Sequence, residues 1–238
     1  LIMERFFDVF LSGLAIIIFT PILVPVMVIL KLTGEGEIFF EQARVGKDKV
    51  PFQLLKFVTM LKNSENMGAG TVTLKNDSRV LPFGKFLRKT KLNELPQLFN
   101  IFKGDMSVIG PRPLHKKQFS FYSEEHQDII ASTMPGLSGV GSIVFRDEER
   151  ILQSNGDPDV TYKQKISPVK GRLEKWYVEN KSIYLYFKLI LLTIIAVAFS
   201  RLNMEKFFKG LDVNTLKIGG KLSPKILIVK PEARLSWQ

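Results

Sequence analysis

The sequence predicts a mixed α+β fold that is dominated by helices and begins with a membrane helix. Two apolar runs, 9–30 and 183–202, lie on either side of a more polar body. Within that body, short apolar stretches such as those in 38–60 alternate with glycine and proline turns, which is typical of strands and helices packed together. The 238 residues are enough for one sizeable domain or two small ones.

The amino-acid composition limits the kinds of catalytic and binding chemistry that this chain can perform. The chain has 34 lysines and arginines against 23 acidic residues, a net charge of +11, and such an excess favours an anionic partner. It has no cysteine, which excludes disulfides, thiolate zinc sites and cysteine nucleophiles. His115 and His126 are the only histidines and neither lies in a nucleophile motif, which argues against a histidine triad. Carboxylate, arginine and magnesium chemistry remains.

The N-terminal run 9–30 carries no charge and is long enough to cross a hydrocarbon core. It does not read as a signal peptide, because the residues before it are of mixed charge. Pro21 and Pro25 should bend or break the helix, and the Thr20 hydroxyl is expected to satisfy part of the freed backbone. Two interpretations stay open, a kinked single-pass helix and a re-entrant helix, since each half is too short to cross alone. In either case the positive charge after residue 30 places the body on the cytoplasmic side.

The second apolar run, 183–202, is interrupted by Lys188 and opens with Tyr184, Tyr186 and Phe187. Aromatic and basic residues together are typical of an interfacial position. We expect an interfacial or partly inserted helix, with a membrane span as the alternative.

Several elements are expected in the body. Asn93 is a good N-cap for a helix over 94–102 that ends at Lys103–Gly104, and the acidic Glu94 suits the positive end of its dipole. The other expected elements are a strand pair or loop followed by a short strand or helix in 38–60, a basic amphipathic segment in 75–92, a rigid loop around Arg112, helices over 123–132 and 171–182, and a strand-like run in the tail 203–238.

These residues could handle a phosphorylated substrate. Acidic side chains could supply oxygen ligands to Mg²⁺, which usually also holds substrate phosphates. Arg88 and Arg112 could bind phosphate oxygens in a bidentate manner. The structural alternative is that both arginines simply pair with Glu94 and Asp105 to tie the fold together. The candidate acidic ligands are Glu94, Asp105, Asp147, Glu148 and Glu149.

The segment 85–113, "KFLRKTKLNELPQLFNIFKGDMSVIGPRP", closely resembles the central motif of the bacterial sugar transferases, the monotopic phosphoglycosyl transferases. The resemblance extends to the N-terminal apolar run with its Thr20–Pro21 pair, to "FEQARVGKDKVPFQLLKFVTM" and to "PGLSGVGSIVFR", and covers roughly residues 3–200. It implies a re-entrant membrane helix at 1–34, a catalytic domain at 35–202 that includes the membrane-associated helix 183–202, and a basic tail at 203–238.

The resemblance also implies an activity. Such enzymes transfer a sugar-1-phosphate from a nucleotide diphosphate sugar, here expected to be a UDP-sugar, to undecaprenyl phosphate, and release UMP. They require Mg²⁺ and initiate the assembly of capsule, O-antigen, exopolysaccharide or other glycans. The expected location is the bacterial inner membrane, with the catalytic domain on the cytoplasmic face against anionic lipid. Homo-oligomerisation stays open.

The family's catalytic Asp–Glu dyad falls on Asn93 and Glu94. The resemblance places Arg88, Arg112, Arg146 and Lys56 in phosphate or substrate binding, and Glu94 and Asp105 at the metal. The chain departs from the family pattern where Val58 replaces a basic residue and, above all, where Asn93 replaces the nucleophilic aspartate.

A carboxamide is neutral and a feeble nucleophile, so Asn93 should not form the family's acyl phosphate. Three hypotheses follow. Glu94 takes the nucleophile role while Asn93 orients a phosphate or caps the helix, the transfer is direct, or the chain is an inactive relative. We favour the first, because the rest of the motif is intact.

The competing class is a non-enzymatic membrane-bound scaffold that binds polyprenyl phosphate or nucleotide sugar. Nucleic-acid binding is not expected. No nucleic-acid module accompanies the charge, and attraction to anionic lipid explains it better.

Overall fold

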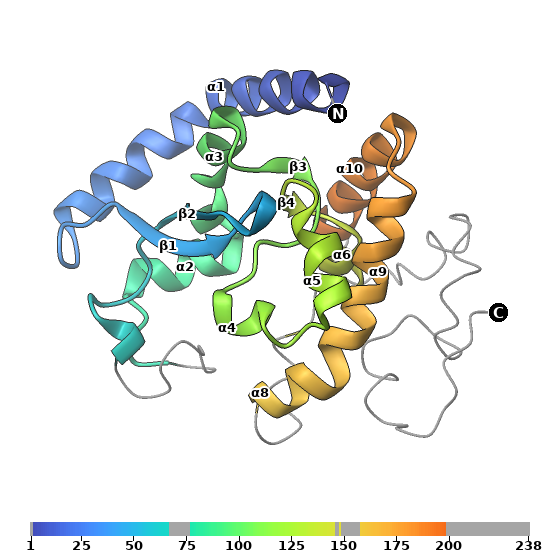
Figure 1. The fold of residues 1–238 in the computed structure, drawn as a ribbon. Helices are drawn as coiled ribbons and strands as arrows, with labels where there is room; N and C mark the ends of the chain where they lie inside the picture. The colour runs from blue at the N-terminus through green and yellow to red at the C-terminus, as the bar shows by residue number, and fades with distance from the viewer. Residues whose placement is uncertain (1, 67–76, 146–147, 149–157, 199–238) are drawn as a thin grey trace. The chain divides into compact units, whose positions relative to one another are not determined.

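The computed structural model has a helix-dominated fold with a small β content, as the sequence predicts (Figure 1). It describes residues 2–66, 77–145, 148 and 158–198. The expected strand-like run in 203–238 therefore lies outside the described residues. In chain order the elements are α1 (Ile2–Leu32), β1 (Phe39–Val45), η1 (Lys47–Lys49), β2 (Pro51–Phe57), η2 (Ser64–Asn66), α2 (Pro82–Thr90), η3 (Leu92–Glu94), α3 (Gln97–Lys103), β3 (Ser107–Ile109), α4 (Lys116–Phe119), α5 (Glu124–Ala131), β4 (Gly136–Ser138), α6 (Val140–Val144), α8 (Pro158–Thr161), η4 (Tyr162–Ile166), α9 (Ser167–Glu179) and α10 (Ile183–Ala198).

The chain forms two compact units. Unit 1 contains Leu1–Glu4, Arg44–Phe52 and Met106–Gln238, and unit 2 contains Arg5–Ala43 and Gln53–Asp105. Strands β1 and β2 pair with each other and are joined by a short connection, which requires an antiparallel hairpin. The expected strand pair in 38–60 is thereby confirmed.

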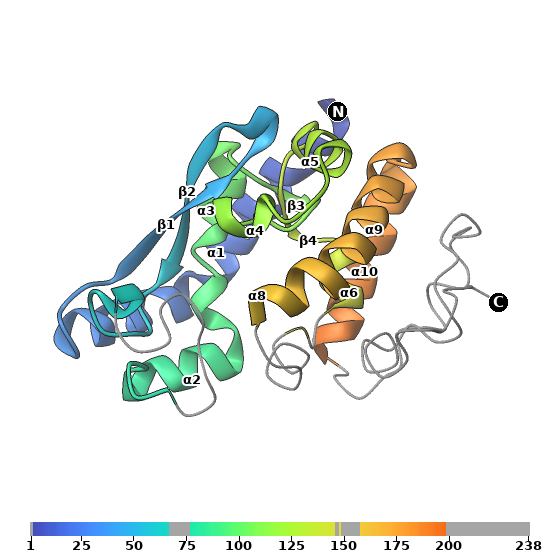
Figure 2. The ribbon, with the colours of Figure 1, turned by 60° about the horizontal axis from the view of Figure 1, so that its bottom comes forward.

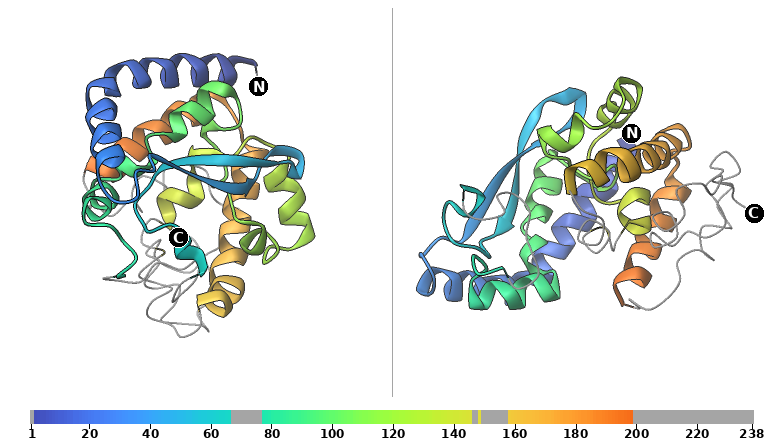
Figure 3. Two further views of the ribbon diagram at one scale, coloured as in Figure 1. Left: turned by 90° about the vertical axis from the view of Figure 1, so that its left-hand side faces the viewer. Right: turned by 90° about the horizontal axis from the view of Figure 1, so that it is seen from below.

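Helix α1 contains Pro21 and Pro25 and bends partway along its length (Figures 1 and 3). Prolines are a common cause of such bends. The Thr20 hydroxyl donates to the carbonyl of Ile16 at 2.7 Å. The carbonyl that Pro21 leaves without its usual donor is that of Ile17, four residues earlier, so the prediction that Thr20 satisfies the freed group is wrong. The bond to Ile16 instead adds to the bending.

Among the described residues, α1 alone is long and apolar enough to cross a membrane, judged by length and composition. Large apolar side chains are exposed along its whole length. They belong to Ile2, Met3, Phe6, Phe10, Leu14, Ile17, Ile18, Ile22, Val24, Val28, Ile29 and Leu32.

The core of unit 2 is built on the second half of α1. Leu23, Val26 and Leu30 are buried there together with Phe57 of β2 and Leu87 of α2. Partly buried side chains packed against this cluster include Leu92 and Leu95, one on each side of Asn93 and Glu94. Figure 3 shows the second half of α1 beside α2. The long apolar helix therefore also forms one wall of the core of unit 2.

The first half of α1 is fixed to α3. The Arg5 guanidinium donates to the carbonyl oxygens of Ile101 and Phe102 at 2.6 and 2.8 Å. These carbonyls lie in the last turn of α3, where the helix itself offers no partner. Gly104 ends α3 in the left-handed conformation, with φ of 108°, as predicted.

Unit 1 is organised around β3 and β4, which pair in parallel with Ser107 opposite Gly136 and Ile109 opposite Ser138. Helix α6 follows β4 directly and lies beside α9 and α10 (Figure 2). The expected helices over 123–132 and 171–182 are found as α5 and α9, and the apolar run forms α10.

The start of β4 and the residue that follows β3 approach each other backbone against backbone. A Cβ atom on Gly136 would lie 2.0 Å from the nitrogen and 2.6 Å from the Cα and oxygen of Gly110. Because real Cβ atoms do not approach backbone so closely, only glycine fits at this point. The segments after β3 and before α6 are thus locked together.

We expect Gly136→Ala to lower the free energy of unfolding by about 3 kcal/mol or more, since overpacking against rigid backbone cannot relax. Thermal unfolding of the purified protein would measure this. Gly13→Ala is the control, because its Cβ would meet only the Phe102 ring, at 3.3 Å. Equal melting temperatures for both variants would contradict this close approach.

Candidate active site

Asn93 and Glu94 lie in η3, a single 3₁₀ turn between α2 and α3. Lys91, with φ of 61°, is the C-cap of α2 and the N-cap of η3. Asn93 therefore lies inside the turn, and the prediction that it caps the following helix is wrong. The N-cap of α3 is Pro96, which has no side-chain donor or acceptor. A left-handed lysine is uncommon and marks a sharp change of direction immediately before the dyad.

The Asn93 side chain is buried, with 9% of its surface exposed. Its Oδ1 atom has no hydrogen-bond partner among the described residues. Buried polar atoms are usually paired, and exceptions often mark functional groups. Asn93 thus holds an unused acceptor next to the carboxylate that the sequence singled out.

The Glu94 side chain is partly exposed, and within the described part of the chain no hydrogen bond or ion pair engages its carboxylate. Its neighbours Leu92 and Leu95 pack against the core of unit 2, so the turn is held on both sides. The result is a carboxylate on an anchored turn that is free to meet a ligand.

Arg88 lies in the last turn of α2. That helix docks on the segment after β2 through Gly84, whose Cβ would lie 2.2 Å from the Thr59 carbonyl oxygen. One turn further on, the Arg88 guanidinium reaches the sulfur of Met60 at 3.8 Å, a weak acceptor. Arg88 does not pair with Glu94 in the described structure, which removes that part of the structural alternative.

The contacts of the Asp105 carboxylate serve to hold the fold together. Its Oδ2 atom accepts from Asn100 Nδ2 at 3.2 Å and lies 3.4 Å from Lys103 Nζ. Asn100 also bonds the backbone of Gln53 and Leu55, at 2.8 and 2.9 Å. The Asp105 carboxylate therefore helps to tie α3 to β2. It follows the end of α3 whereas Glu94 precedes its start, and a helix of this length is about 10 Å long.

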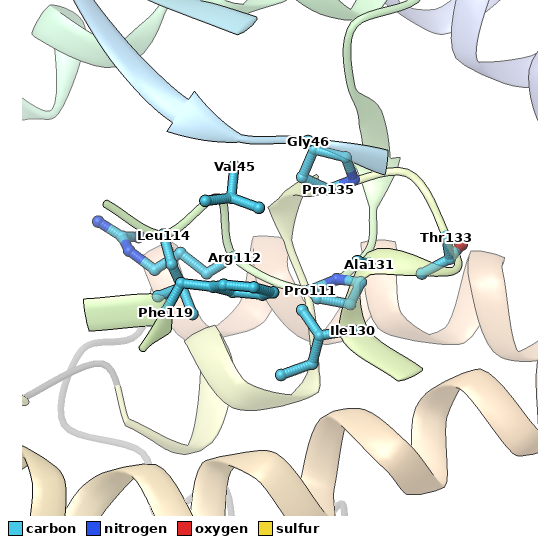
Figure 4. A pocket seen from close by; sticks show the side chains of 10 residues that line it. All are labelled: Val45, Gly46, Pro111, Arg112, Leu114, Phe119, Ile130, Ala131, Thr133 and Pro135. Atoms are coloured by element: carbon cyan, nitrogen blue, oxygen red, sulfur yellow. The ribbon is translucent and has the colours of Figure 1, made fainter. Parts of the chain in front are cut away.

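Arg112 follows β3 in unit 1, between the buried residues Pro111 and Pro113. A small hollow of about 10 Å³ adjoins it, and Figure 4 shows the apolar side chains of Pro111, Ile130 and Ala131 there while the Arg112 side chain extends away from them. The residue itself is exposed. The loop is thus a fixed support for a guanidinium that reaches into solvent.

The structure gives little information on the other two predicted binding residues, Lys56 and Arg146. Lys56 lies on β2, is partly buried and is already engaged in an interaction. Arg146 and Asp147 lie outside the described residues. No group of three or more acidic or histidine side chains forms a metal site in the described ranges.

The sequence did not point to a buried charged cluster in unit 1. Lys170 and Glu174 lie one turn apart on α9, and each is only 2% exposed. Lys170 Nζ is 2.6 Å from Glu148 Oε2 and lies over the Phe145 and Tyr162 rings. Burial alone would lower the pKa of Lys170, but Glu148 and Tyr162 outweigh it and the net shift is upward. The sequence could have revealed the cluster, because Lys170 and Glu174 lie on a face of the helix that is otherwise largely apolar.

Burial raises the pKa of Glu174 to about 7, against the opposing effects of Lys170 and of the backbone N–H groups of Arg112 and Gly141. Burial also raises the pKa of Tyr122 and Tyr162, whose hydroxyls lie 3.1 Å apart. Such a cluster of shifted groups is typical of functional sites.

A separate cavity of about 610 Å³ lies along α5 and α9. None of the predicted site residues lines it. The lining side chains are Phe121, Tyr122, Ser123, Glu125, His126, Ser167, Pro168, Arg172, Lys175, Trp176 and Glu179.

Comparison with known proteins identifies the family to which this chain belongs. The bacterial sugar transferase family matches residues 1–200. The chain is 31% identical over 212 residues to the exopolysaccharide production protein ExoY of Rhizobium meliloti (strain 1021), covering 83% of this chain and 86% of the relative. The chain belongs to the bacterial sugar transferase family.

Other relatives are longer. The UDP-glucose:undecaprenyl-phosphate glucose-1-phosphate transferase of Klebsiella pneumoniae is 34% identical over 205 residues, covering 82% of this chain but 40% of the relative. A UDP-N-acetylgalactosamine-undecaprenyl-phosphate N-acetylgalactosaminephosphotransferase of Aeromonas hydrophila is 33% identical over 198 residues, covering 80% and 42%. The chain thus spans about two fifths of the length of these two relatives.

The shifted pKa of Glu174 predicts how stability depends on pH. The folded-state value of about 7 lies above the ordinary 4.5, so the stabilising contribution is present below pH 4.5 and is lost as the pH rises through 7. Glu174→Gln removes this loss. We expect the free energy of unfolding of the variant, relative to the parent, to rise by about 3 kcal/mol between pH 4.5 and 7. Denaturation at several pH values measures it, and a pH-independent difference would contradict the shift.

Proposed function

We propose that this chain transfers a sugar-1-phosphate from a nucleotide diphosphate sugar, specifically a UDP-sugar, to undecaprenyl phosphate, giving undecaprenyl-diphosphate sugar and UMP. The observation that carries the proposal is the carboxylate of Glu94, which has no partner among the described residues and lies on an anchored turn. The named relatives differ in the sugar that they transfer and share undecaprenyl phosphate as acceptor. The proposal is therefore specific for the acceptor and general for the sugar. The product would initiate assembly of an exopolysaccharide, capsule, O-antigen or related glycan.

Glu94 is the proposed nucleophile. One of its carboxylate oxygens attacks the phosphorus that bears the sugar, the bond to the UMP oxygen breaks, and an acyl phosphosugar forms on Glu94. A phosphate oxygen of undecaprenyl phosphate then attacks the same phosphorus and releases the Glu94 carboxylate. Dividing the transfer into two displacements avoids a direct encounter of two anionic substrates. Arg88 and Arg112 are the proposed partners of the phosphate oxygens.

Asn93 is the proposed orienting residue of the dyad. Its buried carboxamide cannot supply a negative charge, but its unpartnered oxygen and its N–H₂ group can hydrogen-bond a substrate or the neighbouring carboxylate. The same substitution motivates the second candidate function, a membrane-bound relative that binds polyprenyl phosphate or nucleotide sugar without turnover.

The residues present fit Mg²⁺ only as an ion that is coordinated jointly by the protein and by the substrate phosphates. It typically takes one or two protein carboxylates and completes its shell with substrate phosphates and water. Glu94 is the free carboxylate for this purpose, whereas Asp105 is engaged with Asn100 and Lys103. Bound Mg²⁺ would neutralise charge on the diphosphate.

We further propose that α1 is re-entrant and that the body lies on the cytoplasmic face of the bacterial inner membrane, against anionic lipid. The bend at the prolines and the exposed apolar side chains of α1 support this. Phe86 of α2 and Phe99 and Phe102 of α3 add exposed aromatic surface in the same unit. Helix α10 has an exposed apolar face as well, consistent with interfacial insertion. Its members are Tyr184, Phe187, Leu191, Ile194 and Val197.

The assignment of Glu94 has a direct test. Glu94→Gln should lower the release of UMP by on the order of a thousandfold, because the neutral amide is a feeble nucleophile and a poorer Mg²⁺ ligand than the carboxylate. Intact-mass analysis of the parent after mixing with a panel of UDP-sugars should show a phosphosugar adduct. Glu124→Gln, in the exposed first turn of α5, is the control and should retain full activity.

The outcomes separate the two candidate functions. Persistent turnover by Glu94→Gln would eliminate Glu94 as the nucleophile. If the parent releases no UMP from any UDP-sugar but still binds undecaprenyl phosphate, the non-enzymatic alternative holds. In that case Asn93→Asp should create activity.

Topology can be tested with single cysteines, because the natural chain has none. Met3→Cys and Lys31→Cys lie near opposite ends of α1, and both side chains are exposed. A re-entrant helix makes both react with a membrane-impermeant maleimide from the cytoplasmic side of inverted vesicles. Lys116→Cys, exposed on α4, reports the side of the body. Labelling of only one end of α1 would establish a span instead.

A further inference from the structure

The carboxylate of Glu174 is a buried acceptor without a complete partner. Neither of its oxygens makes a full hydrogen bond within the described residues. The backbone N–H groups of Arg112 and Gly141 come close enough to lower its pKa. A Cβ on Gly141 would lie 2.2 Å from Glu174 Oε1, so the side chain fits directly against the start of α6. Burying an incompletely paired carboxylate costs stability, and such groups are retained mainly where they serve function.

The backbone around Arg112 is otherwise fixed residue by residue. The Tyr177 hydroxyl donates to the Ile109 carbonyl at 3.1 Å. The Gly110 N–H donates to Ser138 at 2.9 Å, and the Pro111 carbonyl accepts from Gly136 at 2.8 Å. On the far side, the Leu114 carbonyl accepts from the Val45 N–H at 3.0 Å. Arg112 lies in the middle of this series, and its own N–H is the one that faces Glu174.

Side chains on one face of α9 contact the segment around Arg112. Lys170, Glu174 and Tyr177 are spaced by four and three residues, which places them on the same side of a helix. Tyr177 holds Ile109, Glu174 faces Arg112, and Lys170 is held in place by Glu148. Helix α9 therefore holds the last residue of β3 through Tyr177 and faces the loop that follows through Glu174.

We propose that Glu174 is a positioning residue for the transfer reaction: its buried carboxylate holds the backbone N–H groups of Arg112 and Gly141 and so fixes the direction in which the Arg112 guanidinium meets a substrate phosphate. This inference rests on the proposed function for its catalytic consequence. Its structural part, the restraint of the loop after β3, does not depend on that function.

Protonation should weaken this restraint, because a neutral acid is a poorer acceptor for two N–H groups. Burial raises the pKa of Glu174 to about 7. The ionisable groups that face the cluster are Lys170, Glu148, Tyr122, Tyr162 and Arg112. None of these has an ordinary pKa between 6 and 8. His126 of α5, which lies against Gly171 of α9, does have its ordinary pKa in that interval, although burial lowers it. The dependence on Glu174 is therefore measured as the ratio of parent to Glu174→Gln activity, because both proteins contain His126.

The experiment uses the full chain in detergent or nanodiscs, as the parent, Glu174→Gln, Arg112→Gln and the double variant. Glu179→Gln, exposed at the end of the same helix, is the matched control. Amide hydrogen exchange over 107–114 should become at least about fivefold faster in Glu174→Gln and stay unchanged in the control. UMP release at pH 8 should fall at least about tenfold in Glu174→Gln, since misplacement of a positioning group by an ångström is costly.

Two comparisons distinguish positioning from general destabilisation. In the Arg112→Gln background, Glu174→Gln should have no further effect on UMP release, because the group it positions is gone. The ratio of parent to Glu174→Gln activity should rise between pH 6 and 8. Multiplicative losses in the double variant, or unchanged exchange over 107–114, would overturn the inference. Exchange does not require turnover, so an inactive parent would reject the proposed function while the loop restraint is still decided.

Discussion

The packing of α1 against the body of unit 2 is the constraint on which the site depends. The second half of this helix buries Leu23, Val26 and Leu30 against Phe57 and Leu87, although most of its surface is apolar and exposed. A helix that served only as an anchor would not need to pack against the body of unit 2. Burying apolar area stabilises the packing by about 25 cal/mol per Å². This contact holds α1 to the turn that carries Asn93 and Glu94.

That packing explains how the turn with Glu94 can expose a charged group and still be rigid. Leu92 and Leu95 flank the dyad and pack into the same cluster, while Arg5 at the other end of α1 holds the last carbonyls of α3. The segment from η3 to the end of α3 is thus fixed at both ends by one helix. The Glu94 carboxylate is thereby connected to the exposed apolar surface of α1 through a short chain of contacts, which suits the proposed transfer to a lipid phosphate.

Unit 1 illustrates a different balance between stability and function. The Lys170–Glu148 pair is satisfied at 2.6 Å, but Glu174 is buried without a complete hydrogen bond. A stability-optimised core would replace it with an apolar residue. Glu174 lies instead next to the backbone N–H groups of Arg112 and Gly141, which is the basis of the positioning role that we propose for it.

The sequence by itself determined the elements and the family, because helix periodicity, the glycine stop at Gly104 and the long motif over 85–113 are local properties of the chain. It also singled out Glu94, since charge type and motif position suffice for that. Only the tertiary structure decided that Asn93 is buried within a 3₁₀ turn capped by Lys91, that Asp105 is engaged with Asn100, and that Glu174 lies beneath Arg112. The burial of Asn93 and the position of Glu174 depend on contacts between residues that are distant in sequence, and the turn depends on the left-handed backbone of Lys91. The contact of Asp105 with Asn100 is local, but it depends on the side-chain geometry at the end of α3. None of these leaves a periodic signal in the chain.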